Sequence, residues 1–168
     1  NIAIIEKEGY EADDVIGTIS KQASDAGHYV TILSGDRDNF QLASDKVTIR
    51  IPRTKMGKTE TEDYDDSKII EEYGVKPVQL IQVKGLMGDT SDNISGVKGI
   101  GEKTALSLIK EQGSVDNLYK NLDDMTLTKS VRAKLENGRQ DALDSRFLAE
   151  IFLQVPVDSD PKSYLLDD

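Results

Sequence analysis

Three glycines within six residues constrain the fold of this chain more than any other feature. They are Gly96, Gly99 and Gly101 in the stretch "GVKGIGEKTA". A helical pattern that begins at Pro77 precedes them, and the amphipathic stretch 102–113 follows them. Glycine disfavours helix interiors and tolerates positive φ, so one helix cannot run through all three positions. The sequence therefore predicts two helices joined by a tight glycine hairpin.

The hairpin from Gly96 to Thr104 has the composition of a phosphate grip. Without Cβ atoms, backbone N–H groups can approach an anion closely, and the N-terminus of the following helix adds its positive dipole end. Lys98 and Lys103 supply charge beside it. Such a grip holds a nucleic-acid backbone without reading a base. The alternative is a plain helix–turn–helix with glycine caps.

The first half of the chain alternates helix and strand signals. A helix is predicted from about Ala12 to Ala26, followed by a buried strand at 29–35 and a short helix at 39–43. The stretch "KVTIRIP" reads as a strand, with a turn at Met56-Gly57 and a weaker returning strand. A further helix ends at Tyr73, capped at its start by Asp65 or Asp66. This alternation predicts an α/β fold.

The second half is predicted to be mostly helical. From about residue 89 the pattern changes to helices, which indicates a separate helical subdomain. Residues 1–88 are then expected to form the α/β core, and 89–140 the helical subdomain. Residues 141–168 return to the core, with "FLQVPVD" as a last strand.

Acidic residues gather at three points where predicted elements begin or end. Each cluster also has a structural interpretation, because acids cap helix starts and bond the backbone of turns. The clusters are Glu11, Asp13 and Asp14, then Asp36 and Asp38, and finally Asp89 and Asp92. Alternate residues of an extended segment point to opposite sides, so Asp36 and Asp38 share one site only if the chain turns, which Gly35 permits. The spacing of three puts Asp89 and Asp92 on one side of a helical turn.

Taken together, these all-oxygen clusters favour bound Mg²⁺ or Mn²⁺ over zinc. The chain carries 31 acids against 21 bases, and its net charge of −10 argues against a nucleic-acid partner if the acids are merely solvated. Seven carboxylates massed around divalent ions would reverse the local sign. Two metal ions about 4 Å apart can activate water and stabilise a leaving oxygen, which would suit a phosphodiester held by the hairpin.

Other features narrow the class of protein. The chain has no cysteine, so disulfides and thiolate metal sites are excluded and a reducing compartment is expected. Its one histidine, His28, lies in a polar stretch and is expected at a loop end rather than on a metal. No membrane-span or signal pattern is present, so we expect a cytoplasmic protein without a membrane partner.

Three stretches carry a resemblance to a known family. They are "GYEADDVIGTIS", "ILSGDRDNFQL" and "LMGDTSDNISGVKGIGEKTALSLI". In order and spacing, from about Gly9 to Val157, the chain resembles the 5′-nuclease (flap endonuclease-like) domain of bacterial DNA polymerase I. The resemblance implies a PIN-like parallel sheet with flanking helices and a helix–hairpin–helix subdomain. It also implies Mg²⁺-dependent hydrolysis of 5′ ends and 5′ flaps of duplex DNA in replication and repair.

The resemblance also implies roles for individual residues. All seven acids become metal ligands, and Asp13, Asp36, Asp38 and Asp89 become the catalytic ones. The hairpin becomes the grip on duplex DNA and holds K⁺ through backbone carbonyls. Its DNA-binding residues are expected to be Gly96, Lys98, Gly99, Gly101, Lys103 and Thr104.

The chain departs from the family pattern in two ways. Ser95 stands where the family usually has proline. An N-terminal strand with a metal-binding Asp and a helical arch are missing, as is the polymerase portion, so a truncated domain with impaired cleavage is expected. Two other functions remain open: a duplex-binding module whose acids only cap helices, and a phosphatase using "GDRD". Phe40 stands where the phosphatase would need Thr or Val.

Overall fold

The computed structural model describes residues 2–55, 57–158 and 160–165, and contacts divide the chain into two compact units. The first comprises Asn1–Lys68 with Ile151–Asp168, and the second comprises Ile69–Glu150. These units do not coincide with the boundaries drawn from the sequence. Helix α3 (Gln79–Met87), which the sequence grouped with the core, packs on α4 (Glu102–Gln112) and α7 (Arg139–Ala149) of the helical unit.

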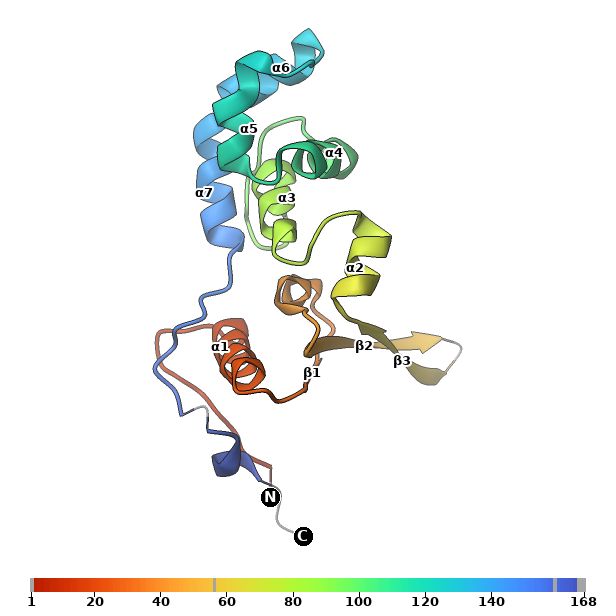
Figure 1. The fold of residues 1–168 in the computed structure, drawn as a ribbon, viewed down its shortest axis with the longest axis vertical. Helices are drawn as coiled ribbons and strands as arrows, with labels where there is room; N and C mark the ends of the chain where they lie inside the picture. Colours follow the sequence, from red (N-terminus) through yellow and green to blue (C-terminus); the bar gives the residue numbers. More distant parts are fainter. Residues whose placement is uncertain (1, 56, 159, 166–168) are drawn as a thin grey trace. The chain divides into compact units, whose positions relative to one another are not determined.

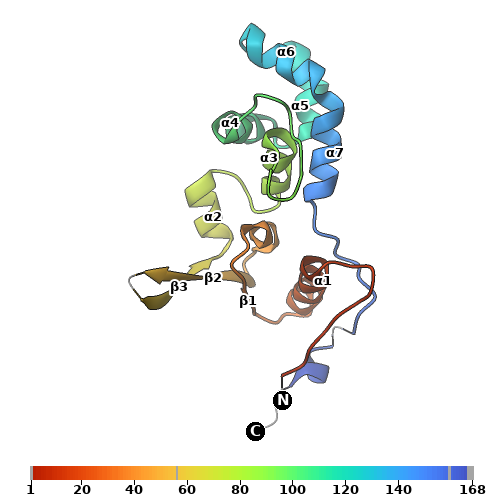
Figure 2. The same cartoon turned by 180° about the vertical axis from the view of Figure 1, so that it is seen from behind.

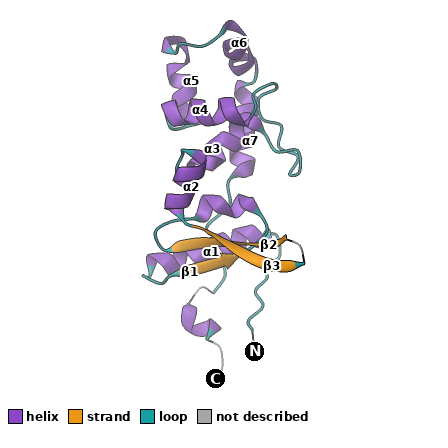
Figure 3. Cartoon of the chain, turned by 90° about the vertical axis from the view of Figure 1, so that its right-hand side faces the viewer, coloured by secondary structure: helices purple, strands orange, loops and turns teal. Residues whose placement is uncertain are grey.

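The sheet of the first unit is mixed rather than wholly parallel (Figure 3). Strand β1 (Val30–Leu33) pairs in parallel with β2 (Val47–Lys55), with Val30 opposite Val47. Strand β3 (Lys58–Tyr64) returns antiparallel to β2, because a connection this short can join only antiparallel neighbours. The predicted returning strand is confirmed, whereas among the strands of the described residues the parallel arrangement holds for the β1–β2 pair alone. Met56 of the predicted turn lies outside the described residues.

Helix α1 (Ala12–Asp25) confirms the helix predicted over 12–26 and lies beside β1 (Figure 1). Its face toward the unit is closely packed. A Cβ added at Gly17 would lie 2.7 Å from Leu153 and 2.8 Å from Ile151, so the chain after residue 150 approaches the helix where the side chain is smallest. The missing side chain of Gly17 therefore lets the last segment of the chain lie directly against this face of α1.

The stretch "FLQVPVD" is not a strand, so this prediction was wrong. Its backbone bonds to side chains instead of a neighbouring strand: Ile151 N donates to Gln41 Oε1 at 2.9 Å, and Val155 N donates to the buried Thr18 Oγ1 at 3.1 Å. Thr18 Oγ1 in turn donates to the Phe152 carbonyl at 3.4 Å. Side chains of α1 and of the turn after β1 thus satisfy backbone groups that a sheet would otherwise pair.

The turn after β1 is a 3-10 helix, η1 (Arg37–Leu42), where a short helix over 39–43 was predicted. Phe40 of this turn is buried and stacks on Tyr64 of β3, with ring centroids 4.5 Å apart. This stacking fixes the turn against the sheet, so that Asp36 and Asp38 at its start are held by a packed aromatic pair.

The second unit is helical (Figure 2). Helix α2 (Asp66–Tyr73) leads into it, and α3 is followed by α4 as the sequence predicts. The remaining helices are α5 (Val115–Asn121), η2 (Leu122–Asp124), α6 (Lys129–Asn137) and α7, while η3 (Pro161–Tyr164) belongs to the first unit. One apolar cluster, which includes Leu86, Ile109, Leu118 and Leu135, forms the core of the helical unit. Within the described residues, no helix combines the length and apolar composition of a membrane span.

Candidate metal-binding carboxylates and phosphate-binding hairpin

Two of the three acids at the start of α1 also serve the fold. Glu11 is the N-cap, and its backbone N donates to Asp14 Oδ2 at 3.3 Å. The other oxygen of Asp14 accepts from Phe152 N at 2.9 Å, which ties the last segment of the chain to α1. The capping interpretation therefore describes Asp14 and Glu11 well. A carboxylate offers about four lone-pair sites, so these bonds leave room for a cation ligand.

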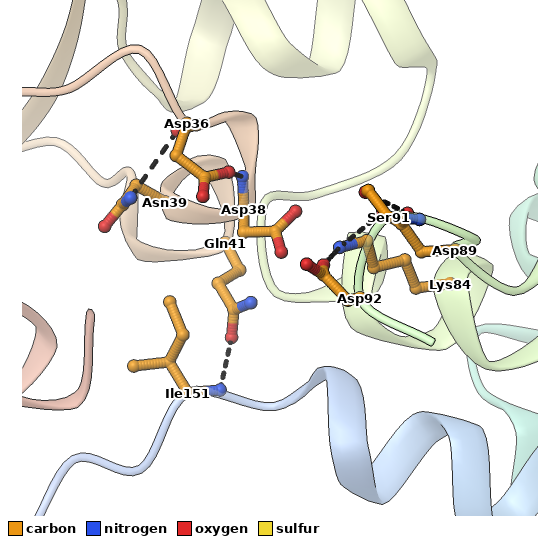
Figure 4. A network of polar contacts seen from close by, with 9 residues as sticks. All are labelled: Asp36, Asp38, Asn39, Gln41, Lys84, Asp89, Ser91, Asp92 and Ile151. Atoms are coloured by element: carbon orange, nitrogen blue, oxygen red, sulfur yellow. Dashed lines mark hydrogen bonds and ion pairs between the residues drawn. The ribbon is translucent and has the colours of Figure 1, made fainter. Parts of the chain in front are cut away.

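Asp13 of α1 and the turn that carries Asp36 and Asp38 lie next to each other. Asn39 connects them, because its Nδ2 contacts Asp13 Oδ1 at 3.3 Å and the Asp36 carbonyl at 3.5 Å. Asp36 is the N-cap of η1, and its Oδ1 accepts from Asp38 N at 2.9 Å (Figure 4). The chain thus turns after β1, which is the condition for Asp36 and Asp38 to share one site. Within one unit, the structure thus places Asp13 of the first cluster next to the turn that carries the second cluster.

Asn39 was not singled out by the sequence. It is fully buried, and its Oδ1 has no partner among the described residues. A buried amide oxygen left unpaired costs about 1–3 kcal/mol, so such an atom on a side chain that also contacts Asp13 indicates a position where a cation could be accommodated. The sequence signal that could have found it is an Asn directly after two aspartates at a strand end.

Asp89 and Asp92 share one cation, the ammonium of Lys84 (Figure 4). Lys84 Nζ lies 2.9 Å from Asp89 Oδ2 and 3.1 Å from Asp92 Oδ2. The spacing of the two acids suggested that they lie on a helix, but the structure shows that they do not. Asp89 pairs through its backbone with Ile94, and a tight turn carries Asp92 back to the same side. The contact with a single ammonium shows that this all-oxygen pair can hold a positive charge.

The environment of Asp89 keeps it ionised. The hydroxyl of Ser91 donates to Asp89 Oδ1, and Ser91 N donates to the same oxygen at 2.9 Å. These bonds, with Lys84 as the second cause, lower the pKa of Asp89 from its ordinary value of 3.8 to about 2. Lys84, missed by sequence reasoning, stands five residues before Asp89 in the last turn of α3.

The predicted hairpin is built around glycine geometry. Gly96 has φ +61°, and a Cβ there would lie 2.2 Å from Gly88 N, so no larger residue fits. The backbone N of Gly96 donates to the buried Ser145 Oγ at 2.9 Å, and Val97 N donates to the Leu86 carbonyl at 2.7 Å. Helices α3 and α7 therefore hold the hairpin in one conformation.

The far end of the hairpin opens α4. Gly101 is the N-cap, and as a glycine it has no side chain that could cap the first N–H groups of this helix. Lys98, Gly99 and Lys103 are exposed, and Thr104 is half-buried. A helix start of this kind, with two exposed lysines beside it, has the arrangement that suits a phosphate ligand.

Comparison with known proteins decides the family. The model described as "5'-3' exonuclease, N-terminal resolvase-like domain" matches residues 1–74, and "5'-3' exonuclease, C-terminal SAM fold" matches residues 75–168. The chain belongs to the 5′-3′ exonuclease family. The resemblance found in the sequence is thereby confirmed, as is the α/β fold with a helical subdomain.

Curated relatives of this chain include DNA polymerases. DNA polymerase I of Bacillus subtilis (strain 168) is 46% identical over 157 residues, which is 94% of the chain and 18% of that protein. DNA polymerase I, thermostable, of Thermus filiformis is 45% identical over 159 residues, 95% of the chain and 18% of that protein. The chain thus spans less than a fifth of the length of the curated relatives it matches.

The solved structures that it resembles include two of a bacteriophage T5 enzyme. A T5 5′-exonuclease with bound zinc superposes with a TM-score of 0.75 at 27% identity, covering 88% of the chain and 52% of that structure. A T5 flap endonuclease in a pseudo-enzyme–product complex with DNA and metal ions gives 0.71 at 27%, covering 89% and 52%.

Proposed function

We propose that the chain is the structure-specific 5′-3′ exonuclease and 5′-flap endonuclease domain of a DNA polymerase I. It would hydrolyse DNA phosphodiesters with two or more divalent ions, in replication and repair. The observation that carries this proposal is that Asp89 and Asp92 share one cation, on the segment that leads into the phosphate-binding hairpin. The family membership and the two T5 structures support it.

Carboxylates would hold the ions in this proposal. Asp36, Asp38 and Asp13 lie on one turn and the adjacent helix start, and Asp89 with Asp92 forms the other group. Glu11 and Asp14 would complete the first group. Because the donors are all carboxylate oxygens, they fit Mg²⁺ or Mn²⁺, which when bound would activate water and stabilise the leaving oxygen.

The protein's own contribution would be orientation. Asp36 is held by its bond to Asp38 N, and Asp89 is kept ionised by Ser91 and Lys84, so both present charged oxygens without a rearrangement. The hairpin would hold a phosphate through the first N–H groups of α4, with Lys98 and Lys103 beside it. The carbonyls of the same hairpin would bind K⁺. Because these groups contact only backbone phosphates, cleavage would depend on the 5′ end or flap and not on base sequence.

The proposal is tested first by metal binding to the 168-residue chain. We expect calorimetric titration with Mn²⁺ to show binding that Asp36→Asn and Asp89→Asn each weaken. Asn keeps an acceptor at each position, including the cap on Asp38 N, so the local hydrogen bonds can be retained while the charge is lost. Asp45→Asn and Asp123→Asn remove the same charge from exposed positions of the two units and serve as matched controls.

Cleavage is tested in a longer polypeptide that contains this chain, because the relatives that the chain matches are much longer than it is. With Mg²⁺ and a 5′-flap substrate, Asp36→Asn and Asp89→Asn should each lower the rate by about 100-fold, equivalent to about 3 kcal/mol. Unchanged rates in both variants would refute the metal assignment. If the chain binds duplex DNA but no divalent metal, the alternative function is supported instead, namely a non-catalytic DNA-binding module.

A further inference from the structure

Lys134 of α6 lies on the phosphate-binding hairpin, although it is 35 residues away from it in the chain. Its Nζ donates to the Gly99 carbonyl at 3.1 Å, and the contact is exposed to solvent. Gly99 has φ +83° and stands between Lys98 and Gly101, at the tip of the hairpin. A third lysine therefore joins the two that the sequence identified.

The stem of Lys134 occupies the face that the missing side chain of Gly99 leaves open. A Cβ added at Gly99 would lie 3.0 Å from Lys134 Cε and 3.2 Å from its Nζ. The lysine is thus packed along the backbone of the hairpin and does not extend freely into solvent. This packing limits the entropy that its ammonium would lose on contacting a ligand held there.

The charge of Lys134 is not neutralised within the described residues. Its partner is a neutral carbonyl, whereas Lys21, Lys68 and Lys84 each bond to a carboxylate. An ammonium has three donors, and the Gly99 carbonyl takes one of them. The hairpin and helix start contain two positive residues, Lys98 and Lys103, and one negative residue, Glu102. Their net charge is therefore one positive charge, and Lys134 doubles it.

We propose that Lys134 contacts a phosphate of the same duplex DNA that the hairpin binds, as a third cation of that grip. This inference rests on the proposed function, because it names a further DNA-binding residue of the same site. The remaining two donors of the ammonium are free to bond phosphate oxygens while the first stays on the Gly99 carbonyl. Lys134 would thus place charge and fix the hairpin at once.

The expected effect follows from counterion release. Losing one phosphate contact lowers the slope of log K against log salt by about 0.9 for duplex DNA. If the contact contributes nothing at 1 M salt, its loss weakens binding by about 15-fold at 50 mM and about 4-fold at 200 mM. The dependence on salt therefore identifies a phosphate contact, which a purely structural role would not show.

The experiment measures binding of a fluorescent duplex to the 168-residue chain by anisotropy, with EDTA present and salt varied. Lys134→Met and Lys134→Gln should both show the full loss, because Gln keeps a donor for the Gly99 carbonyl but carries no charge. Lys134→Arg should stay within about twofold, since the charge remains. Lys110→Met is the matched control: Lys110 lies at the opposite end of α4, against Gly74.

Each outcome decides the matter. The phosphate contact is refuted if Lys134→Gln binds duplex DNA as tightly as the unchanged chain, or if Lys134→Met loses no more affinity than Lys110→Met. The proposed function stands in either case. If the unchanged chain does not bind duplex DNA at all, the proposed function fails and this inference with it. Thermal melting of each variant shows whether it folds, and should Lys134→Met not fold, the Gln variant decides.

Discussion

Replacing Gly96 by alanine should destabilise the helical unit strongly. An L-residue at φ +61° costs about 1–2 kcal/mol, and the new Cβ would meet the backbone of Gly88 at 2.6 Å or less, where no flexible side chain can yield. Moving the hairpin to relieve this contact would break the bond from Gly96 N to the buried Ser145 Oγ, which costs about 1–3 kcal/mol. The loss should therefore reach about 3 kcal/mol.

Thermal melting followed by circular dichroism measures this loss. At about 4–8 °C per kcal/mol for a unit of this size, Gly96→Ala should lower the Tm of the helical unit by about 12–24 °C. Gly101→Ala is the control in the same hairpin, because its φ is −95° and nothing lies within 4 Å of the added Cβ. If the two variants melt within about 2 °C of each other, the hairpin is not held by glycine geometry and the reasoning is refuted.

Three further predictions concern single side chains. Asp89→Asn should destabilise the chain above about pH 4, and this destabilisation should disappear as the pH falls to about 2. The reason is that the pKa of Asp89 is lowered in the folded chain, so its stabilising charge is lost over that range. Urea unfolding of both chains at several pH values checks this, and a difference in stability that does not change with pH would contradict it. Ser145→Ala should cost about 1–3 kcal/mol by leaving Gly96 N unpaired, unlike the exposed Ser130→Ala, and equal urea midpoints would count against it. Thr18→Val should speed proteolysis around Val155, whose N it releases, and unchanged cleavage would show that this bond does not hold the segment.

Local signals in the sequence predicted the helices and the hairpin well. Glycine positions and apolar spacing depend only on neighbouring residues, so α1, α4 and the turn at Gly96 could be found without knowing the fold. The last segment misled because "FLQVPVD" has the composition of a strand. Its partners are side chains more than 100 residues away, such as Thr18, and a composition pattern does not contain them.

The candidate site was predictable only in part for the same reason. The carboxylates stand out because several acids gather at element ends. Their supporting residues do not: Asn39, Lys84 and Lys134 are ordinary polar residues whose roles arise from long-range or turn geometry. Asp89 and Asp92 share a cation through a tight turn and not through helical spacing, so their closeness was predicted for an incorrect local reason.

Paramagnetic broadening by Mn²⁺ tests the central claim most directly, since it locates bound metal on each unit of the 168-residue chain. In ¹⁵N-correlated spectra, the account predicts that amides near Asp13, at 36–39 and at 89–93 broaden first, at substoichiometric Mn²⁺. The adjacent acids Asp65-Asp66 and Asp123-Asp124 provide the internal comparison. Broadening there to the same degree, or none at the predicted carboxylates, would contradict the claim that these residues hold the metal.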